Sequence, residues 1–328
     1  ECQLCDIQKY RIAEFIKKYN IDLFFIGIGQ RYCCYDLNGI NCKCIVTVHD
    51  VGDIEIWSNE INKFIFDNNR SHFSNIVKNI WGILKNKSIV KSVFNKYNNL
   101  IKLLINENTT VITVSEYSKN SIKYYFRDLC NKEILVLYPP QKNYKVEATP
   151  QNNILKNCIE NHVKYILFVN ASRADKNFKI LKKISNAVRD RWPELKFLVT
   201  GINNSVNGNI LAVGRLTNSD IELAYKHAWA LLYPSFNEGF GYPPVESIKY
   251  GVPVISSNVC SMPEILSDCA IFFSPIYQSD LFNKINLLNE SYDLYKTKAK
   301  NQSVQIAKRQ LKDFTSLINI ITENSHFS

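Results

Sequence analysis

Short apolar runs alternate with stretches of helical periodicity along this chain, and this alternation constrains the fold more than any other feature. In the second half the runs lie at 165–169, 196–200, 210–213, 230–233, 253–256 and 270–273. Helical patterns separate them at 178–189, at 219–228, and from Pro243 and Pro263, where proline suits a first helical turn. Strands that are apolar on both faces and alternate with helices predict a parallel sheet covered on both sides.

The first half carries the same alternation with one departure. Helical patterns at 7–19, at 73–105 and after Ser115 accompany predicted strands at 22–26, 44–48, 110–114 and 134–138. A doubly wound domain normally begins with a strand and a glycine-bearing turn. Here six residues and a helix come first, so we expect the first domain to be incomplete, with its first strand missing.

The chain is long enough for two domains, because 328 residues exceed the size at which a single core stops growing. Pro139 and Pro140, followed by a polar run to Asn153, predict an interdomain linker. We therefore predict a Rossmann-like domain at 1–145 and a second at 146–328, with the last helix a candidate to cross back to the first domain. Ligands belong at the carboxyl ends of the strands of such sheets.

Composition excludes several classes of protein. A hydrophobic fraction of 46% and a charged fraction of 21% indicate a globular chain, and no apolar run approaches the roughly 18 residues of a membrane span. The ten scattered cysteines lack a disulfide framework, which favours a reducing, cytoplasmic setting. Cys2 and Cys5 have zinc-ligand spacing, but Cys42 and Cys44 are too close together to complete a usual site, so we expect no metal.

The net charge of +10 favours anionic partners such as phosphates, lipid headgroups or nucleic acid. The lysine excess accompanies abundant asparagine and isoleucine, so base composition of the gene explains it equally well. No base-reading motif or aromatic platform accompanies the charge, and we expect no nucleic-acid partner.

The most informative segment, 233–247, follows an apolar strand and opens a helix at a proline pair. Glu238 lies in the loop and Glu246 in the first helical turn. The backbone amides and the helix dipole suit a phosphate, whereas carboxylates suit hydroxyl groups. A sugar nucleotide offers both, with its diphosphate between two polyols; the alternative is a helix-capping acid beside an exposed loop acid. The loop residues expected to contact this donor are Gly239, Phe240 and Gly241.

A second segment, 168–177, places two cations in the loop between a strand and a helix. Arg173 offers a planar fork and Lys176 a point charge, and together they can neutralise a diphosphate leaving group. The alternative is ordinary solvated surface charge.

Together these residues resemble glycosyltransferase family 4, the retaining nucleotide-sugar transferases of the GT-B fold. The resemblance implies an α/β chain of two Rossmann-like, doubly wound parallel-sheet domains that face a cleft. Two glutamates eight residues apart are the family signature. By this resemblance Arg173 and Lys176 contact the donor phosphates, Glu238 contacts the transferred sugar, and Glu246 contacts the ribose.

Further segments support the resemblance over most of 110–275. Gly201 follows Thr200, and Arg215 with Leu216 lies near the expected base pocket. In the first half, His49 would lie near the transferred sugar, although a histidine that ends a strand is often only packed. The family's opening strand with its glycine-rich loop is not found, so the acceptor side is left open.

The predicted function is metal-independent transfer, with retention, of a hexose from a GDP- or UDP-hexose to a saccharide or lipid-linked acceptor. Cell-envelope polysaccharide or glycoconjugate synthesis is the expected setting, and no cofactor is expected beyond the donor. Two alternatives remain open: a GT-B epimerase or phosphorylase-like enzyme, and a non-catalytic module that binds sugar nucleotides.

The segment 73–105 carries six lysines and no acidic residue. Its apolar residues follow helical spacing, so it is a candidate for contact with an anionic membrane surface from the cytoplasmic side. A helix packed by its apolar face, with solvated lysines, has the same sequence pattern. The apolar residues are Val90, Val93, Phe94, Tyr97, Ile101 and Leu104.

Overall fold

The computed structural model describes residues 12–59, 61, 62, 65, 75–141, 147, 149–204 and 208–324, with side chains of 75–87 left undescribed. The predicted helix at 7–19 is thus described from Ile12 on, and Cys2 and Cys5 lie outside the described residues. The chain forms two compact units. The first comprises Glu1–Lys63, Asp67–Pro140 and Gln310–Ser328, and the second comprises Phe64–Phe66 and Gln141–Arg309.

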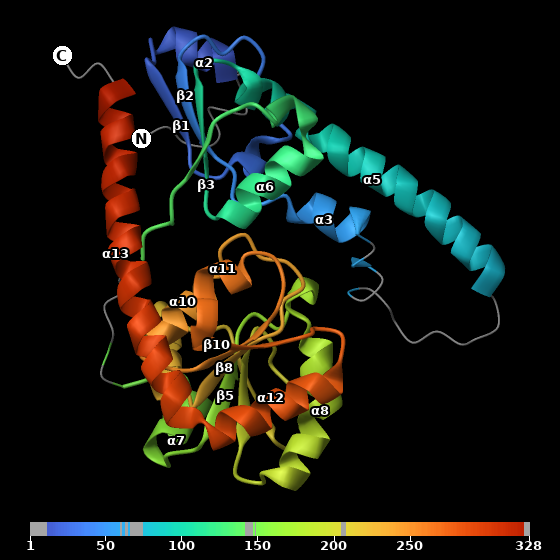
Figure 1. Cartoon of the computed structure of the whole chain (residues 1–328), viewed down its shortest axis with the longest axis vertical. Coiled ribbons are helices and arrows are strands. Elements are labelled where there is room, and N and C mark those ends of the chain that lie inside the picture. The colour runs from blue at the N-terminus through green and yellow to red at the C-terminus, as the bar shows by residue number, and fades with distance from the viewer. Residues whose placement is uncertain are drawn as a thin grey trace. The chain divides into compact units, whose positions relative to one another are not determined.

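The first unit contains a parallel sheet, whose four described strands follow the order β1-β2-β3-β4 (Figure 1). Val46 and Val111 are buried partners at its centre. The strands are β1 (Leu23–Ile26), β2 (Lys43–Thr47), β3 (Thr109–Thr113) and β4 (Ile134–Val136). Its helices are α2 (Ile12–Lys18), α3 (Gly52–Ser58), α5 (Asn75–Ile105) and α6 (Glu116–Tyr125), with 3-10 turns η1 (Gly29–Tyr32) and η2 (Arg127–Leu129).

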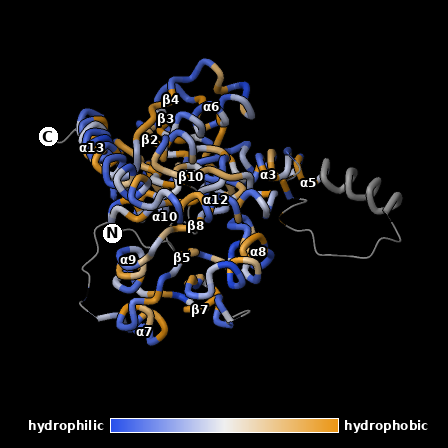
Figure 2. The backbone as a smooth tube through the Cα atoms, turned by 60° about the horizontal axis from the view of Figure 1, so that its bottom comes forward, coloured by the Kyte–Doolittle hydropathy of each residue, from blue (hydrophilic) through white to orange (hydrophobic). Residues whose placement is uncertain are grey.

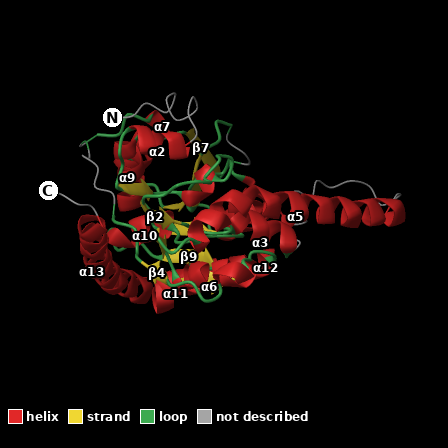
Figure 3. Cartoon of the chain, turned by 90° about the horizontal axis from the view of Figure 1, so that it is seen from above, coloured by secondary structure: helices red, strands yellow, loops and turns green. Residues whose placement is uncertain are grey.

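The helix α5 runs without a break over 31 residues (Figure 3). Tyr97, Leu100 and Leu104 are buried in the core of the first unit, while Lys96 faces solvent and pairs with Asp53 at 3.0 Å. The apolar face of the described part of this helix therefore packs against the core of the first unit. For the apolar residues, this agrees with the packed-helix interpretation and not with contact to a membrane.

The second unit contains a six-stranded parallel sheet in the order β10-β9-β8-β5-β6-β7. This order reverses between the neighbours β5 and β8, as in a doubly wound Rossmann sheet. The strands are β5 (Tyr165–Phe168), β6 (Lys196–Thr200), β7 (Ile210–Gly214), β8 (Ala230–Tyr233), β9 (Val254–Ser257) and β10 (Ala270–Phe273). The helices are α7 (Asn153–Glu160), α8 (Phe178–Arg191), α9 (Asn218–His227), α10 (Tyr242–Lys249), α11 (Met262–Leu266) and α12 (Gln278–Glu290), with 3-10 turns η3 (Ala174–Lys176) and η4 (Ser267–Cys269).

Both faces of this second sheet are buried, which explains its continuous apolar strands. Figure 2 colours the backbone by the hydropathy of each residue. Ile166 and Phe168 belong to the core formed with α8 and α12. On the other face, the hydroxyl of Tyr165 donates to the carbonyl of Ala224 in α9 at 2.8 Å. The predicted parallel α/β architecture is confirmed.

The last helix, α13 (Tyr292–Asn324), contributes residues to both units. Within the second unit, Gln302 donates to the carbonyl of Ile265 at 2.8 Å. Within the first unit, Gln310 donates to the carbonyl of Pro139 at 2.7 Å and the Asp313 carboxylate accepts from the Tyr138 amide at 2.8 Å. Among the described residues, no helix combines the length and apolarity needed to cross a membrane.

Candidate functional site

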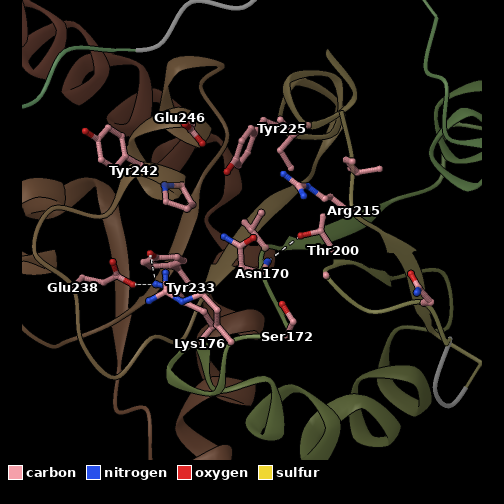
Figure 4. A pocket seen from close by; sticks show the side chains of 17 residues that line it. Asn170, Ser172, Lys176, Thr200, Arg215, Tyr225, Tyr233, Glu238, Tyr242 and Glu246 are labelled. Atoms are coloured by element: carbon pink, nitrogen blue, oxygen red, sulfur yellow. Dashed lines mark hydrogen bonds and ion pairs between the residues drawn. The ribbon is translucent and has the colours of Figure 1, made fainter. Parts of the chain in front are cut away.

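A pocket of about 750 Å³ opens at the carboxyl edge of the second sheet (Figure 4). Its wall comes from segments that follow β5, β6, β7 and β8, together with α9 and α10. Because β5 and β8 are neighbours where the strand order reverses, their loops separate there and leave a crevice. The lining residues are Val169, Asn170, Ser172, Arg173, Lys176, Thr200, Gly201, Asn203, Arg215, Leu216, Ile221, Tyr225, Tyr233, Glu238, Tyr242, Pro243 and Glu246.

The structure brings seven of the predicted site residues to this one pocket. Two are cations after β5, two are carboxylates after β8, and three come from the ends of β6 and β7. They are Arg173, Lys176, Glu238, Glu246, Gly201, Arg215 and Leu216.

Lys176 is nearly buried, with 4% of its surface exposed. Its ammonium forms an ion pair with the Glu238 carboxylate and donates to the Tyr233 hydroxyl at 3.1 Å. Ser235 donates its hydroxyl to the same carboxylate at 2.7 Å. A buried ion pair is tolerated when further hydrogen bonds satisfy both groups, as they do here.

A buried set of serines holds the Glu238 loop on the sheet. Ser257, at the end of β9, donates to the carbonyl of Ser235 at 2.6 Å. Ser261 donates to the carbonyl of Glu238 at 2.9 Å. Two side-chain hydrogen bonds from Ser257 and Ser261 therefore hold the loop that carries the carboxylate.

Arg173 lies at the mouth of the pocket, with 61% of its side chain exposed. Its guanidinium donates twice to Asp175, from Nε to Oδ1 at 3.1 Å and from Nη2 to Oδ2 at 2.8 Å. Burial acts to lower the pKa of Arg173, but the charge of Asp175, the hydrogen bonds to Asp175 and the charge of Glu238 together raise it. The turn η3 is followed by Asn177, whose left-handed backbone, with φ of 57°, directs the chain into α8.

Glu246 faces the pocket from the first turns of α10, between two tyrosines (Figure 4). Burial, the charge of Glu246 and a hydrogen bond to Glu246 raise the pKa of Tyr225 well above its usual range. Burial and the charge of Glu246 also raise the pKa of Tyr242 to about 12. Both phenols stay protonated at neutral pH, so the Tyr225 hydroxyl is a donor that orients the carboxylate.

The predicted donor contacts Gly239, Phe240 and Gly241 are not among the lining residues of this pocket. Phe240 is buried, with 3% exposed, and packs against Tyr242 with ring centroids 5.5 Å apart. Gly241 precedes α10 with φ of 83°, and a Cβ there would lie 2.3 Å from Cε of Met262. The geometry gives Phe240 and Gly241 a part in shaping the turn that presents Glu246.

The opposite wall is formed by close backbone packing. Gly201 has φ of 86°, and a Cβ at this position would lie 3.2 Å from the amide nitrogens of Ala171 and Ser172. Thr200 accepts from the Asn170 amide at 2.9 Å. Only glycine fits this approach without displacing the loop after β5.

His49 lies in the first unit, in the segment between β2 and α3. Its Nε2 donates to the carbonyl of Gly27 at 3.1 Å, and its own carbonyl accepts from Ser118 Oγ at 2.9 Å. Its expected place near the transferred sugar stays a prediction. Within the described residues, no group of three His, Cys, Asp or Glu side chains is arranged to hold a metal ion.

Sequence reasoning missed Asn203, Ile221 and Tyr225, which line the pocket. Ile221 and Tyr225 are four residues apart on α9 and so share one face of that helix. Their place in the sequence could have indicated them, because α9 directly follows the loop that contains Arg215 and Leu216.

Residues 151–305 match the family model described as glycosyl transferases group 1. The match covers almost the whole of the second unit and just under half of the chain. The pocket just described therefore lies in the part of the chain that matches this model of group 1 glycosyltransferases.

Comparisons with individual proteins agree with this match. The chain is 28% identical over 183 residues to O-antigen chain mannosyltransferase B of Escherichia coli, covering 50% of this chain and 47% of that protein. It is 27% identical over 201 residues to O-antigen chain mannosyltransferase RfbU of Salmonella typhimurium, covering 57% and 52%. The chain thus spans about half the length of the curated relatives it matches.

The structure of Anabaena HepE in complex with UDP-glucose has a TM-score of 0.63 against this chain at 15% identity, covering 97% of this chain and 84% of that chain. At this identity the likeness shows the fold alone. With two parallel-sheet α/β units, the chain has the GT-B fold, as the sequence predicts.

Proposed function

We propose that this protein transfers a hexose from a nucleoside-diphosphate sugar to a saccharide or lipid-linked saccharide in the synthesis of a cell-envelope polysaccharide or glycoconjugate. The observation that supports the proposal most strongly is that two cations and two carboxylates line one pocket, within the residues that match the group 1 glycosyltransferase model. The names of the relatives favour mannose as the sugar, and the HepE complex supports a nucleotide-sugar donor.

The four side chains suit distinct parts of such a donor. Arg173 and Lys176 would hold the diphosphate and stabilise the negative charge that develops on it as the glycosidic bond breaks. Glu238 would accept hydrogen bonds from sugar hydroxyls, and Glu246 from the ribose. Gly201, Arg215 and Leu216 would border the base, either guanine or uracil.

Three finer features belong to the same proposal. The sugar is transferred with retention at its anomeric carbon, the two cations replace a metal at the diphosphate, and His49 approaches the transferred sugar. Phe240 and Gly241 act on the donor through the turn that they shape, and Gly239 of the same loop contacts the donor.

The decisive assay offers GDP- and UDP-hexoses with mannose-containing and lipid-linked acceptors, and identifies the products by mass spectrometry and NMR. Transfer with retained anomeric configuration is expected. Arg173→Ala and Lys176→Ala should each lower the rate by about 10² to 10³. Full activity in both variants would contradict the assignment. Donor binding without transfer or hydrolysis would favour a binding module, and an epimerised donor would favour an epimerase.

We further propose that the protein works at the cytoplasmic face of a membrane, where the exposed lysines of α5 contact anionic lipid. Lys91, Lys96 and Lys102 are exposed on the described part of this helix. Flotation with phosphatidylglycerol vesicles should show binding that salt weakens, and Lys91→Glu with Lys102→Glu should reduce it. Binding that is insensitive to salt and to these changes would contradict this role.

A further inference from the structure

Asp175 lies between the two cations assigned to the diphosphate. One carboxylate accepts both hydrogen bonds of the Arg173 fork, at 3.1 and 2.8 Å. The same carboxylate lies 3.5 Å from the ammonium of Lys176. A single acidic side chain therefore contacts both groups that would bind phosphate.

The backbone of Asp175 is joined to the loop that carries Glu238. Its carbonyl accepts from the amide of Phe236, two residues before Glu238, at 2.9 Å. The Asp175 side chain is 19% exposed, whereas that of Arg173 is 61% exposed. Arg173 is thus the member of the pair that can rotate away.

The charges of this cluster cancel. Arg173 and Lys176 contribute two positive charges, and Asp175 and Glu238 contribute two negative charges. A guanidinium binds a carboxylate and a phosphate in the same bidentate mode. Asp175 occupies the Nε–Nη2 edge of Arg173, so a diphosphate that binds this edge competes with Asp175 for the same two N–H groups.

We propose that Asp175 is a positioning residue that competes with the diphosphate for Arg173 and so limits the affinity of the pocket for the nucleoside diphosphate product. This inference rests on the proposed function. Without a ligand, the Arg173 guanidinium is hydrogen-bonded to Asp175 at the pocket mouth. These hydrogen bonds break when the donor binds and form again when the product leaves.

Calorimetric titration of GDP and UDP into the purified chain at several salt concentrations tests this inference. Asp175→Asn removes the competing charge and should tighten binding of the preferred nucleotide about 2- to 5-fold. Its affinity should also fall more steeply with salt, because the pocket gains one net positive charge. In turnover assays the donor KM should fall while kcat does not rise, a division that a loss of packing would not produce.

Three variants make the result specific. Asp175→Ser, which also removes the carboxylate, should show the same gain, and Arg173→Ala combined with Asp175→Asn should abolish it. Asp190→Asn breaks an exposed arginine–aspartate pair with a 3.4 Å separation in the same unit and should leave affinity unchanged. Equal or weaker nucleotide binding by both folded Asp175 variants would overturn this inference alone. If the wild type bound neither nucleotide, the proposed function would fall with it.

Discussion

The ammonium of Lys176 and the carboxylate of Glu238 form an ion pair in which only 5% and 12% of the two side chains are exposed. Lys176 comes from the loop after β5 and Glu238 from the loop after β8. These strands are neighbours in the sheet, although 62 residues separate Lys176 from Glu238 in the sequence. The two loops meet because the strand order reverses between β5 and β8. Burial of the ion pair makes it sensitive to the loss of either partner.

Lys176→Met should destabilise the second unit by about 3–5 kcal/mol, because it leaves the Glu238 carboxylate buried without its cation. The double change Lys176→Met with Glu238→Gln should recover a large part of that loss, since no unpaired charge remains. Urea unfolding followed by circular dichroism measures both. Equal losses for the single and double variants would show that the pairing is not what stabilises the loop.

Tyr225→Phe should weaken binding of the nucleoside diphosphate about 10-fold, equivalent to about 1.4 kcal/mol, because Glu246 loses the buried hydroxyl that orients it. Tyr165→Phe is the matched control. Tyr165 is also buried and its hydroxyl donates to the Ala224 carbonyl of α9, but it does not line the pocket. An equal effect of both changes on affinity would point to a general loosening of α9.

Gly241→Ala should destabilise the second unit by about 1–3 kcal/mol, because the new Cβ meets the buried Met262 and the backbone is left-handed. Gly208→Ala separates the effect of the left-handed backbone from the effect of the contact with Met262. Gly208 also has a positive φ, of 54°, but a Cβ there meets no described heavy atom within 4 Å. Thermal unfolding should therefore show a larger loss at Gly241, and similar losses would mean that Met262 yields without cost.

The buried thiol of Cys269 should make the second unit less stable at high pH. Burial, with a smaller contribution from Asp268, raises its pKa from 9.0 to about 12. Between these values the unfolded chain loses this proton while the folded chain keeps it, so the contribution of Cys269 to the free energy of unfolding should fall by about 1.4 kcal/mol per pH unit. Cys269→Ala should reduce the measured slope by this amount, whereas Cys34→Ala, at an exposed cysteine, should leave it unchanged.

The sequence predicts the sheets well because their strands are apolar on both faces. The runs at 196–200, 230–233 and 270–273 coincide with β6, β8 and β10. The helix α7 is not predicted, although Asn152 caps it by accepting from the Ile154 and Leu155 amides, because it is only eight residues long and begins where the predicted linker ends. A capping residue at the end of a polar run carries too little signal to separate a short helix from a loop.

The site could be predicted only in part, for a different reason. Arg173, Lys176, Glu238 and Glu246 stand in recognisable segments, and the structure brings them to one pocket. Tyr225 contributes through a contact between two helices, α9 and α10, which no local pattern encodes. Contacts between distant segments depend on the strand order, and that order is not visible in any single segment.

The most direct test of the account is calorimetric titration of GDP and UDP into the wild type and into the Arg173→Ala and Lys176→Ala variants. The wild type should bind one nucleotide per chain, and each variant, while still folded, should bind it at least about 10-fold more weakly. Undiminished binding in both folded variants, or no binding of either nucleotide by the wild type, would contradict the claim that this pocket holds a nucleoside diphosphate.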